Sequence, residues 1–177
     1  MKILITIFFL TSLVACSSTP IPTPSNTAGK MFPKVSAKSL DGETVSIPDK
    51  FIGKPSMLLI GYKQNAQFDI DRWILGILQA DIPVQIVELP TIAGMMPQMV
   101  QSFIDNGMRK GIPKEDWASV VTVYEDASKI IEAIGNENPQ NAHAVLLNKN
   151  AEIVWISNRG YSAQQILDLK RLVETLS

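Results

Sequence analysis

The chain contains a single cysteine, Cys16, which stands at the end of an apolar run near the amino terminus. One cysteine cannot form a disulfide within the chain. The residues after it must therefore fold around a hydrophobic core alone, and 46% apolar residues in 177 are enough for one such domain. The same count excludes redox chemistry that needs two thiols in one chain.

The amino-terminal stretch predicts a lipoprotein signal peptide at residues 1–15. Lys2 is followed by a mostly apolar run, which is shorter than the ~20 residues of a membrane-spanning helix. Leu13-Val14-Ala15-Cys16 resembles a lipobox, the sequence at which bacterial lipoproteins are acylated on the cysteine and cleaved just before it. We therefore expect Cys16 to carry palmitate and further acyl chains. An uncleaved signal anchor is the alternative.

The lipobox resemblance also implies a location and a partner. Several acyl chains on one cysteine hold a protein stably on a lipid bilayer. Ser17 follows Cys16 where an aspartate would alter sorting, which favours the outer membrane, facing the periplasm, of a Gram-negative cell envelope. Besides the bilayer, an envelope protein is an expected partner. The net charge of −1, without a basic stripe, argues against nucleic acid.

Residues 16–30 predict a tether and residues 31–177 a single domain. The tether is rich in Pro, Ser and Thr and has little to bury, so it is expected to be extended and semi-stiff. Removal of the first fifteen residues would leave 162, which suits one domain plus this linker.

The domain sequence alternates strand and helix patterns. Asp41-Gly42 between two alternating runs predicts a hairpin within residues 31–48. Strands are predicted at residues 56–62, 84–89, 120–124, 144–147 and 153–156. A helix is predicted after the polar loop Lys63-Gln64-Asn65 and is ended by Asp81 and Pro83. Further helices are predicted at residues 95–106 and 127–134, and after Ser162. The order predicts an α/β fold with a central mixed sheet, an N-terminal hairpin and flanking helices.

Two helices carry specific expectations. In the first, the predicted buried face consists of Ile70, Trp73, Ile74, Ile77 and Leu78. In the second, Gly107 is predicted to cap the carboxyl end. The apolar side of that second helix is predicted to consist of Met96, Met99, Val100, Phe103 and Ile104.

Two segments resemble the thioredoxin-like fold in its peroxiredoxin-like form. Asp41 to Ser46, followed by Gly53-Lys54-Pro55 and an apolar strand, is similar to the opening of peroxiredoxins and membrane-anchored thiol-disulfide proteins. His143 to Val154 resembles the thioredoxin segment in which a cis-proline precedes a strand, a tight turn and another strand. The resemblance covers residues 32–176 and implies this fold, but a fold that hosts many functions implies no activity by itself.

The redox residues of thioredoxins are missing from the matching positions. Gln64 to Phe68 stands where Cys-x-x-Cys is expected, just after the first central strand. His143 stands at the cis-proline position, and the bond before it is expected to be trans because a cis bond without proline costs about 3–4 kcal/mol. Thiol exchange and thiol peroxidase chemistry are therefore excluded within one chain.

Four scattered segments resemble the mitochondrial ATP synthase assembly-factor family, which shares this fold without the cysteine pair. They are Ala66-Gln67, Val84 to Glu88, Arg109 to Pro113, and Glu152 to Trp155. This resemblance implies a thioredoxin-like assembly or binding module and names no target.

The loops beside the missing cysteine pair predict a binding rim. Its candidate residues are Tyr62, Lys63, Gln64, Asn65, His143, Arg159 and Tyr161. The alternative is that they are ordinary loop ends, and that His143 merely replaces a proline. Asp69 and Asp71 point in different directions on a helix and predict no acid–base pair. No catalytic residue, metal ligand or cofactor is predicted.

The predicted function is that of a membrane-anchored envelope lipoprotein whose redox-inactive domain binds or helps to assemble another protein. One alternative is an antioxidant or thiol-linked enzyme that borrows a thiol from a partner chain. Another is copper handling by the thioethers of Met95, Met96, Met99 and Met108. The competing interpretation of these methionines is an adaptable core or a partner-binding surface.

Overall fold

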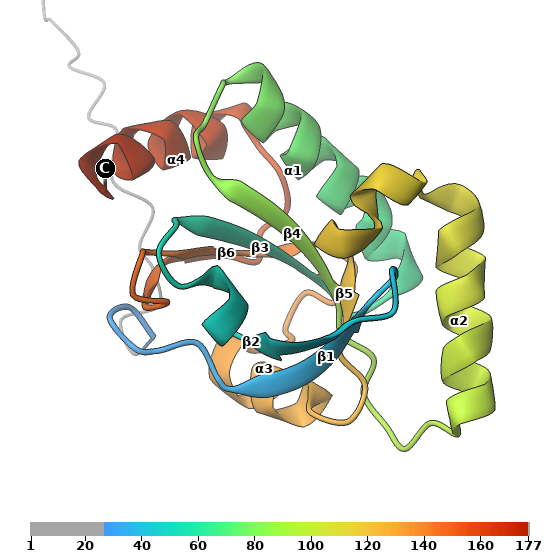
Figure 1. Ribbon diagram of the computed structural model, residues 1–177. Coiled ribbons are helices and arrows are strands. Elements are labelled where there is room, and N and C mark those ends of the chain that lie inside the picture. Colours follow the sequence, from blue (N-terminus) through green and yellow to red (C-terminus); the bar gives the residue numbers. More distant parts are fainter. Residues whose placement is uncertain (1–26, 177) are drawn as a thin grey trace, which may run out of the picture.

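The computed structural model describes residues 27–176, so the predicted signal peptide, Cys16 and most of the predicted tether lie outside the described residues. The strands are β1 (Val35–Ser39), β2 (Thr44–Ile47), β3 (Ser56–Gly61), β4 (Gln85–Pro90), β5 (Val121–Thr122), β6 (His143–Leu147) and β7 (Ile153–Ser157) (Figure 1). The helices are α1 (Gln67–Gln79), α2 (Gln98–Gly111), α3 (Ala127–Ile134) and α4 (Ala163–Leu176). Short 3₁₀ turns are η1 (Asp49–Phe51), η2 (Gln64–Ala66) and η3 (Lys114–Ser119).

The centre of the molecule is a four-stranded mixed sheet in the order β4-β3-β6-β7. β3 pairs parallel with β4 and antiparallel with β6, and β6 pairs antiparallel with β7. The apolar run Met57 to Ile60 in β3 is fully buried because helices or strands cover both faces of this sheet. The predicted α/β architecture with a central mixed sheet is confirmed.

The predicted hairpin forms a second sheet in the order β2-β1-β5. Gly42 adopts φ +100° in the turn, a conformation that glycine takes without a steric penalty. β5 is shorter than the predicted strand 120–124. Its flanking residues instead form isolated parallel bridges, between Val120 and Glu88 of β4 and between Val123 and Thr91, the residue after β4. These bridges join the two sheets.

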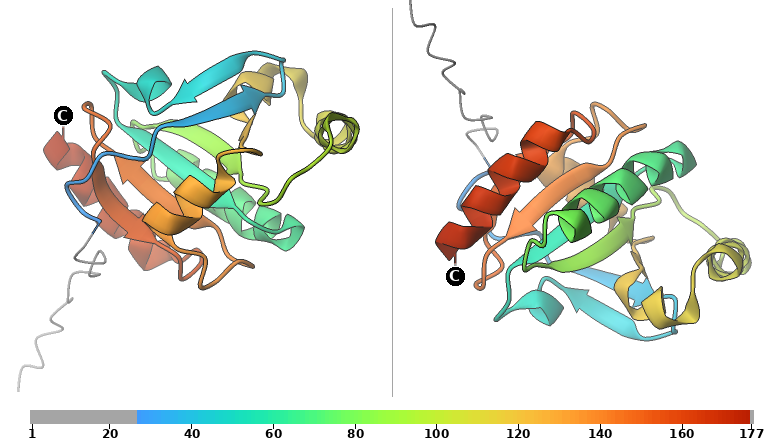
Figure 2. Two further views of the ribbon diagram at one scale, coloured as in Figure 1. Left: turned by 90° about the horizontal axis from the view of Figure 1, so that it is seen from below. Right: turned by 90° about the horizontal axis from the view of Figure 1, so that it is seen from above.

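Two hydrophobic cores lie on the two faces of the central sheet. α1 and α4 run side by side over one face (Figure 2). Trp73 of α1 is fully buried there and meets Trp155 edge-on, with ring centroids 5.7 Å apart. The β1–β2 hairpin and α3 cover the other face. Leu78 was expected in the buried face of α1 but is 63% exposed, because that face is narrower than the sequence spacing suggests.

α2 differs most from expectation. It begins at Gln98 and runs to Gly111, so the predicted cap at Gly107 is wrong. Among the fourteen residues of α2, only Asp105 is fully buried, and its carboxylate accepts a hydrogen bond of 2.7 Å from the Tyr124 hydroxyl. Met99 and Phe103 are 84% and 79% exposed. An amphipathic helix normally turns its apolar stripe to the core, whereas α2 turns Met99 and Phe103 outward and buries the polar Asp105. Ile104 and Met108 are half-buried.

The first described residues line the outer edge of β7. The backbone N–H of Gly29 donates to the carbonyl of Ile153 at 2.8 Å, and the N–H of Ile153 donates to the carbonyl of Lys30 at 2.8 Å. Residues 27–30 belong to the stretch for which the sequence predicts a tether. Pairing at this position covers an edge strand that would otherwise expose free backbone groups.

Candidate functional site

The loop from β3 to α1 contains the residues that stand where the sequence resemblance leads one to expect a cysteine pair. Lys63, Gln64 and Asn65 are exposed there, at and beside η2. The Gln67 side-chain amide donates to Asp71 at 2.9 Å and to Glu88 at 3.1 Å. Burial raises the pKa of Glu88, and the hydrogen bond from Gln67 partly offsets that rise. The loop thus offers amides and carboxylates where a thiolate would be needed.

Buried His143 and half-buried Tyr62 form an aromatic pair behind this loop. His143 begins β6 opposite Ile60 and is fully buried, and its ring meets Tyr62 edge-on with centroids 4.9 Å apart. The peptide bond before His143 is trans, as expected. Neither nitrogen of the His143 imidazole has a hydrogen-bond partner within residues 27–176, and the Tyr62 hydroxyl has none there either. Such buried polar atoms favour the neutral imidazole.

Burial lowers the pKa of His143, although the nearby Asn138 backbone and the Glu137 carboxylate oppose the shift. Because the unfolded chain protonates near pH 6.5, the folded state is expected to lose stability as the pH falls below that value. His143 is the only histidine, so His143→Phe should remove this loss while keeping an aromatic contact with Tyr62. Urea unfolding at about pH 7.5 and about pH 5.5 measures it. Equal pH dependence in both proteins would contradict the expectation.

Asp69 joins the two loops that flank the predicted rim. This residue in the first turn of α1 is buried, and its two carboxylate oxygens accept from the backbone N–H groups of Ala142 at 2.9 Å and Tyr161 at 2.8 Å. Asp71, two residues on, is exposed. The two carboxylates do point apart, as predicted. Nothing in the sequence pattern marks Asp69 as a link, because both of its partners are distant backbone groups.

Arg159 and Tyr161 follow β7 and have different surroundings. Tyr161 is half-buried and packs edge-on against Trp73 with centroids 5.8 Å apart. Arg159 is exposed and forms part of the wall of a cavity. The structure therefore places Lys63, Gln64, Asn65 and Arg159 at the surface and places Tyr62, His143 and Tyr161 wholly or partly beneath it.

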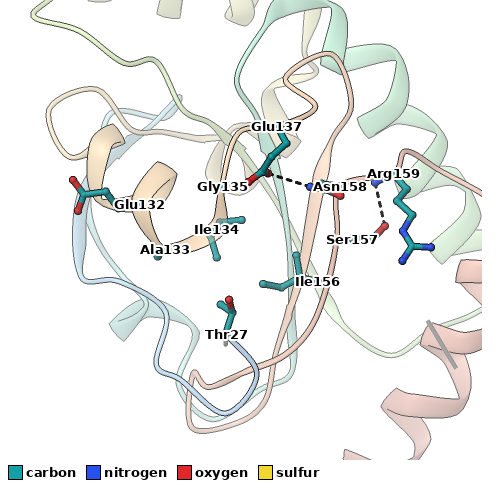
Figure 3. Close-up of a pocket in the computed structure, with 10 residues that line it drawn as sticks. All are labelled: Thr27, Glu132, Ala133, Ile134, Gly135, Glu137, Ile156, Ser157, Asn158 and Arg159. Carbon is teal, nitrogen blue, oxygen red and sulfur yellow. Dashed lines mark hydrogen bonds between the residues drawn. The ribbon is translucent and has the colours of Figure 1, made fainter. Parts of the chain in front are cut away.

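The cavity beside Arg159 has a volume of about 310 Å³ and lies between the end of α3, the end of β7 and Thr27 (Figure 3). Glu137 bends across its upper side and accepts a hydrogen bond of 3.2 Å from the Asn158 amide. Its remaining lining residues are Glu132, Ala133, Ile134, Gly135, Ile156 and Ser157. A second cavity of about 440 Å³, lined by Lys54, Pro55, Pro83, Val84 and Gln85, contains none of the predicted site residues.

None of the four methionines is buried in the core. Met95 and Met99 are exposed, and Met96 and Met108 are half-buried. Across residues 27–176, no three His, Cys, Asp or Glu side chains gather closely enough to hold a metal ion. Over the same range, every helix is too short or too polar to cross a membrane.

A family model described as ATP10 protein matches residues 21–176. The chain belongs to the ATP10 protein family. The match spans the whole described domain, and it confirms the resemblance to the ATP synthase assembly factors. No curated protein matches this ATP10-family chain in sequence.

Solved structures similar to this ATP10-family chain are thioredoxin-like. The exposed lipoprotein thioredoxin Etrx1 of Streptococcus pneumoniae is 13% identical with a TM-score of 0.55, over 81% of this chain and 100% of that chain. A thiol peroxidase from Chromobacterium violaceum is 9% identical with a TM-score of 0.56, over 85% and 89%. Copper-bound ScoI of Arabidopsis thaliana is 12% identical with a TM-score of 0.52, over 82% and 97%. At these identities the likeness establishes the fold alone.

Proposed function

We propose that this protein is a lipid-anchored assembly module of the ATP10 family that binds a subunit of a membrane complex through its polar rim and performs no thiol chemistry. The observation that carries the proposal is the start of α1. Gln64 and Gln67 stand on either side of Asn65-Ala66, where the fold would place a redox pair. The Gln67 side-chain amide donates hydrogen bonds to the carboxylates of Asp71 and Glu88. A thioredoxin-like domain that keeps its core and lacks its nucleophile is suited to binding.

The rim has the character of a protein-binding surface. Lys63, Gln64 and Asn65 are exposed on one loop and Arg159 on another, so cationic and amide groups are available to a partner. Asp69 holds the second loop through the backbone of Tyr161 and also fixes the chain before β6. A surface of this kind recognises a polar, acidic segment by hydrogen bonds and charge, with little reorganisation on binding.

Site-specific photocross-linking in intact cells tests whether the polar rim binds a specific partner protein, the proposed client. A photoreactive residue at Lys63 or Arg159 should cross-link to one discrete envelope protein. The matched control is the same residue at Glu174, which is exposed near the end of α4. Cross-linking of the same protein from all three positions, or of none from the rim, would contradict the proposal.

Thiol assays separate the proposal from the enzymatic alternative. Insulin reduction and peroxide consumption by the purified chain should not exceed the buffer blank, because the chain has no second thiol. A clear activity that disappears in His143→Ala would favour an enzyme that uses the rim, and would overturn the binding proposal.

The anchor proposed at Cys16 is supported by the Leu13-Val14-Ala15-Cys16 pattern. Cys16→Ser should move the protein from the outer-membrane fraction to a soluble or unprocessed form and abolish incorporation of labelled palmitate. Ser17→Ala is the control, since it leaves the acceptor thiol in place. A membrane fraction that is unchanged in Cys16→Ser would show that the apolar run itself anchors the chain.

A further inference from the structure

The outward face of α2 has no partner among the described residues. Its row of residues spaced four apart consists of Met99, Phe103, Gly107 and Gly111. With about 3.6 residues per turn, Phe103 and Gly107 lie on the side of the helix opposite buried Asp105. Figures 1 and 2 show α2 at the margin of the molecule, away from both sheets.

The row is bulky at one end and smooth at the other. Phe103 and Met99 protrude, while a Cβ added at Gly107 or Gly111 would meet nothing within 4 Å. Glycine inside a helix costs about 1 kcal/mol relative to alanine, so Gly107 lowers the stability of α2. The missing side chain would, however, allow a second helix to approach closely at Gly107, and that contact could offset the cost.

We propose that α2 pairs with α2 of a second copy of this chain, antiparallel, with Phe103 of each copy seated over Gly107 of the other. The two-fold axis of this pair passes the outward face of α2 at the level of residue 105. The same axis places Met99 of each copy opposite Gly111 of the other, so each protruding side chain faces a glycine. Packing of such i, i+4 ridges is the commonest way in which helices cross. The pairing is isologous and therefore closes as a dimer.

The available apolar area lies at the lower limit of a specific dimer contact. Met95, Met99, Val100 and Phe103 are all exposed, and together they offer on the order of 600 Å², close to the ~800 Å² that each partner buries in a standard interface. The row itself carries no charge, and Lys110 would lie beside Val100 of the second copy, where its stem can cover apolar surface.

The position of the amino-terminal segment favours a second copy over the bilayer. Residues 27–30 enter along β7, on the side of the molecule remote from α2 (Figure 1). A lipid anchor preceding them would therefore be attached to the domain on the side away from α2. The proposed dimer contact does not involve the polar rim, so the dimer and the binding of a client at the rim can be tested independently.

Mixed disulfide cross-linking tests both the partner and its orientation. Met99→Cys and Gly111→Cys, carried by two differently tagged copies of the full chain, are co-expressed and treated with a thiol oxidant in intact cells. Residues 99 and 111 lie about 18 Å apart along one helix, so only an antiparallel pair brings the two together. We expect about tenfold more disulfide-linked dimer in the mixture than in either single variant.

Phe103→Glu, introduced into both copies, should abolish the cross-link, because it would bury a charge over Gly107. Phe68→Glu is the matched control, since Phe68 is 72% exposed on α1 and lies outside the proposed contact. Cross-linking of Met99→Cys to itself would overturn the antiparallel arrangement. Cross-linking to a different protein, or none in the mixture, would overturn the second copy as the occupant of this face.

Discussion

Asp69→Asn is expected to lower the free energy of unfolding by roughly 2–3 kcal/mol. The carboxylate accepts two backbone N–H groups in a buried position, from Ala142 and Tyr161. Asparagine has one acceptor oxygen, so one N–H would lose its partner and face an amide NH₂ group instead. Removing the charge also weakens the hydrogen bond that remains. Urea unfolding followed by tryptophan fluorescence measures the change, since Trp73 lies in the adjacent core.

The same substitution at Asp71 is the control for Asp69→Asn. Asp71 is exposed in the same helix and accepts a hydrogen bond from the Gln67 side chain, so Asp71→Asn should change stability by less than about 0.5 kcal/mol. A further consequence is specific to Asp69. Because it fixes the loop that carries Arg159, through the backbone of Tyr161, Asp69→Asn should reduce cross-linking from Arg159 even at temperatures where the domain stays folded. Equal effects of the two substitutions would show that Asp69 does not hold the loops.

Gly76→Ala is expected to destabilise the domain by about 1–3 kcal/mol, although alanine is the better helix former. Gly76 lies where α1 crosses α4, and a Cβ there would come within 2.7 Å of Tyr161 Cε2 and 2.9 Å of Ile166 Cδ1. Tyr161 cannot move freely, because its ring packs against Trp73 and its backbone is bound by Asp69. The methyl group must therefore push the two helices apart. Thermal unfolding of the purified chain measures the loss.

Gly107→Ala provides a matched comparison, because it makes the same change inside another helix. No atom lies within 4 Å of the added Cβ at that position. In a chain diluted until it is monomeric, this substitution should stabilise α2 by up to about 1 kcal/mol. The two substitutions are therefore expected to change the free energy of unfolding in opposite directions, because an added Cβ has room at Gly107 and none at Gly76. A stabilising Gly76→Ala would mean that α1 and α4 pack more loosely than the distances indicate.

The strands were predictable from the sequence, whereas the attachment of α2 was not. Apolar runs such as Met57 to Ile60 locate β3 because a strand covered on both faces has no polar side. The periodicity of α2 correctly predicts a helix with one apolar side, yet periodicity cannot tell which side faces the domain. That choice depends on Asp105 meeting the Tyr124 hydroxyl and on the Arg109 guanidinium reaching the carbonyl of Leu40 at 2.7 Å. These are long-range contacts between polar groups, which leave no pattern in the local sequence.

The candidate site divides in the same way. The absence of a cysteine pair at Gln64 to Gln67 can be read directly from the sequence, and so can the histidine, His143, at the expected proline position. The depth of His143 and its contact with Tyr62 depend on the register of β6 against β3, which pairs His143 with Ile60. The link through Asp69 depends on how two loops distant in sequence return to α1. Exposure and tertiary hydrogen bonding are therefore the parts that only the structure supplies.

The pairing of the amino-terminal segment with β7 determines how the domain responds to mechanical load. Gly29, Lys30 and Phe32 are joined by backbone hydrogen bonds to Ala151 and Ile153, before the chain continues to β1. Tension along the amino-terminal segment is therefore shared with the edge of the central sheet before it reaches the hairpin. Several hydrogen bonds must shear together before β1 is loaded, so a pull from that end should leave the rim undistorted until this short pairing gives way.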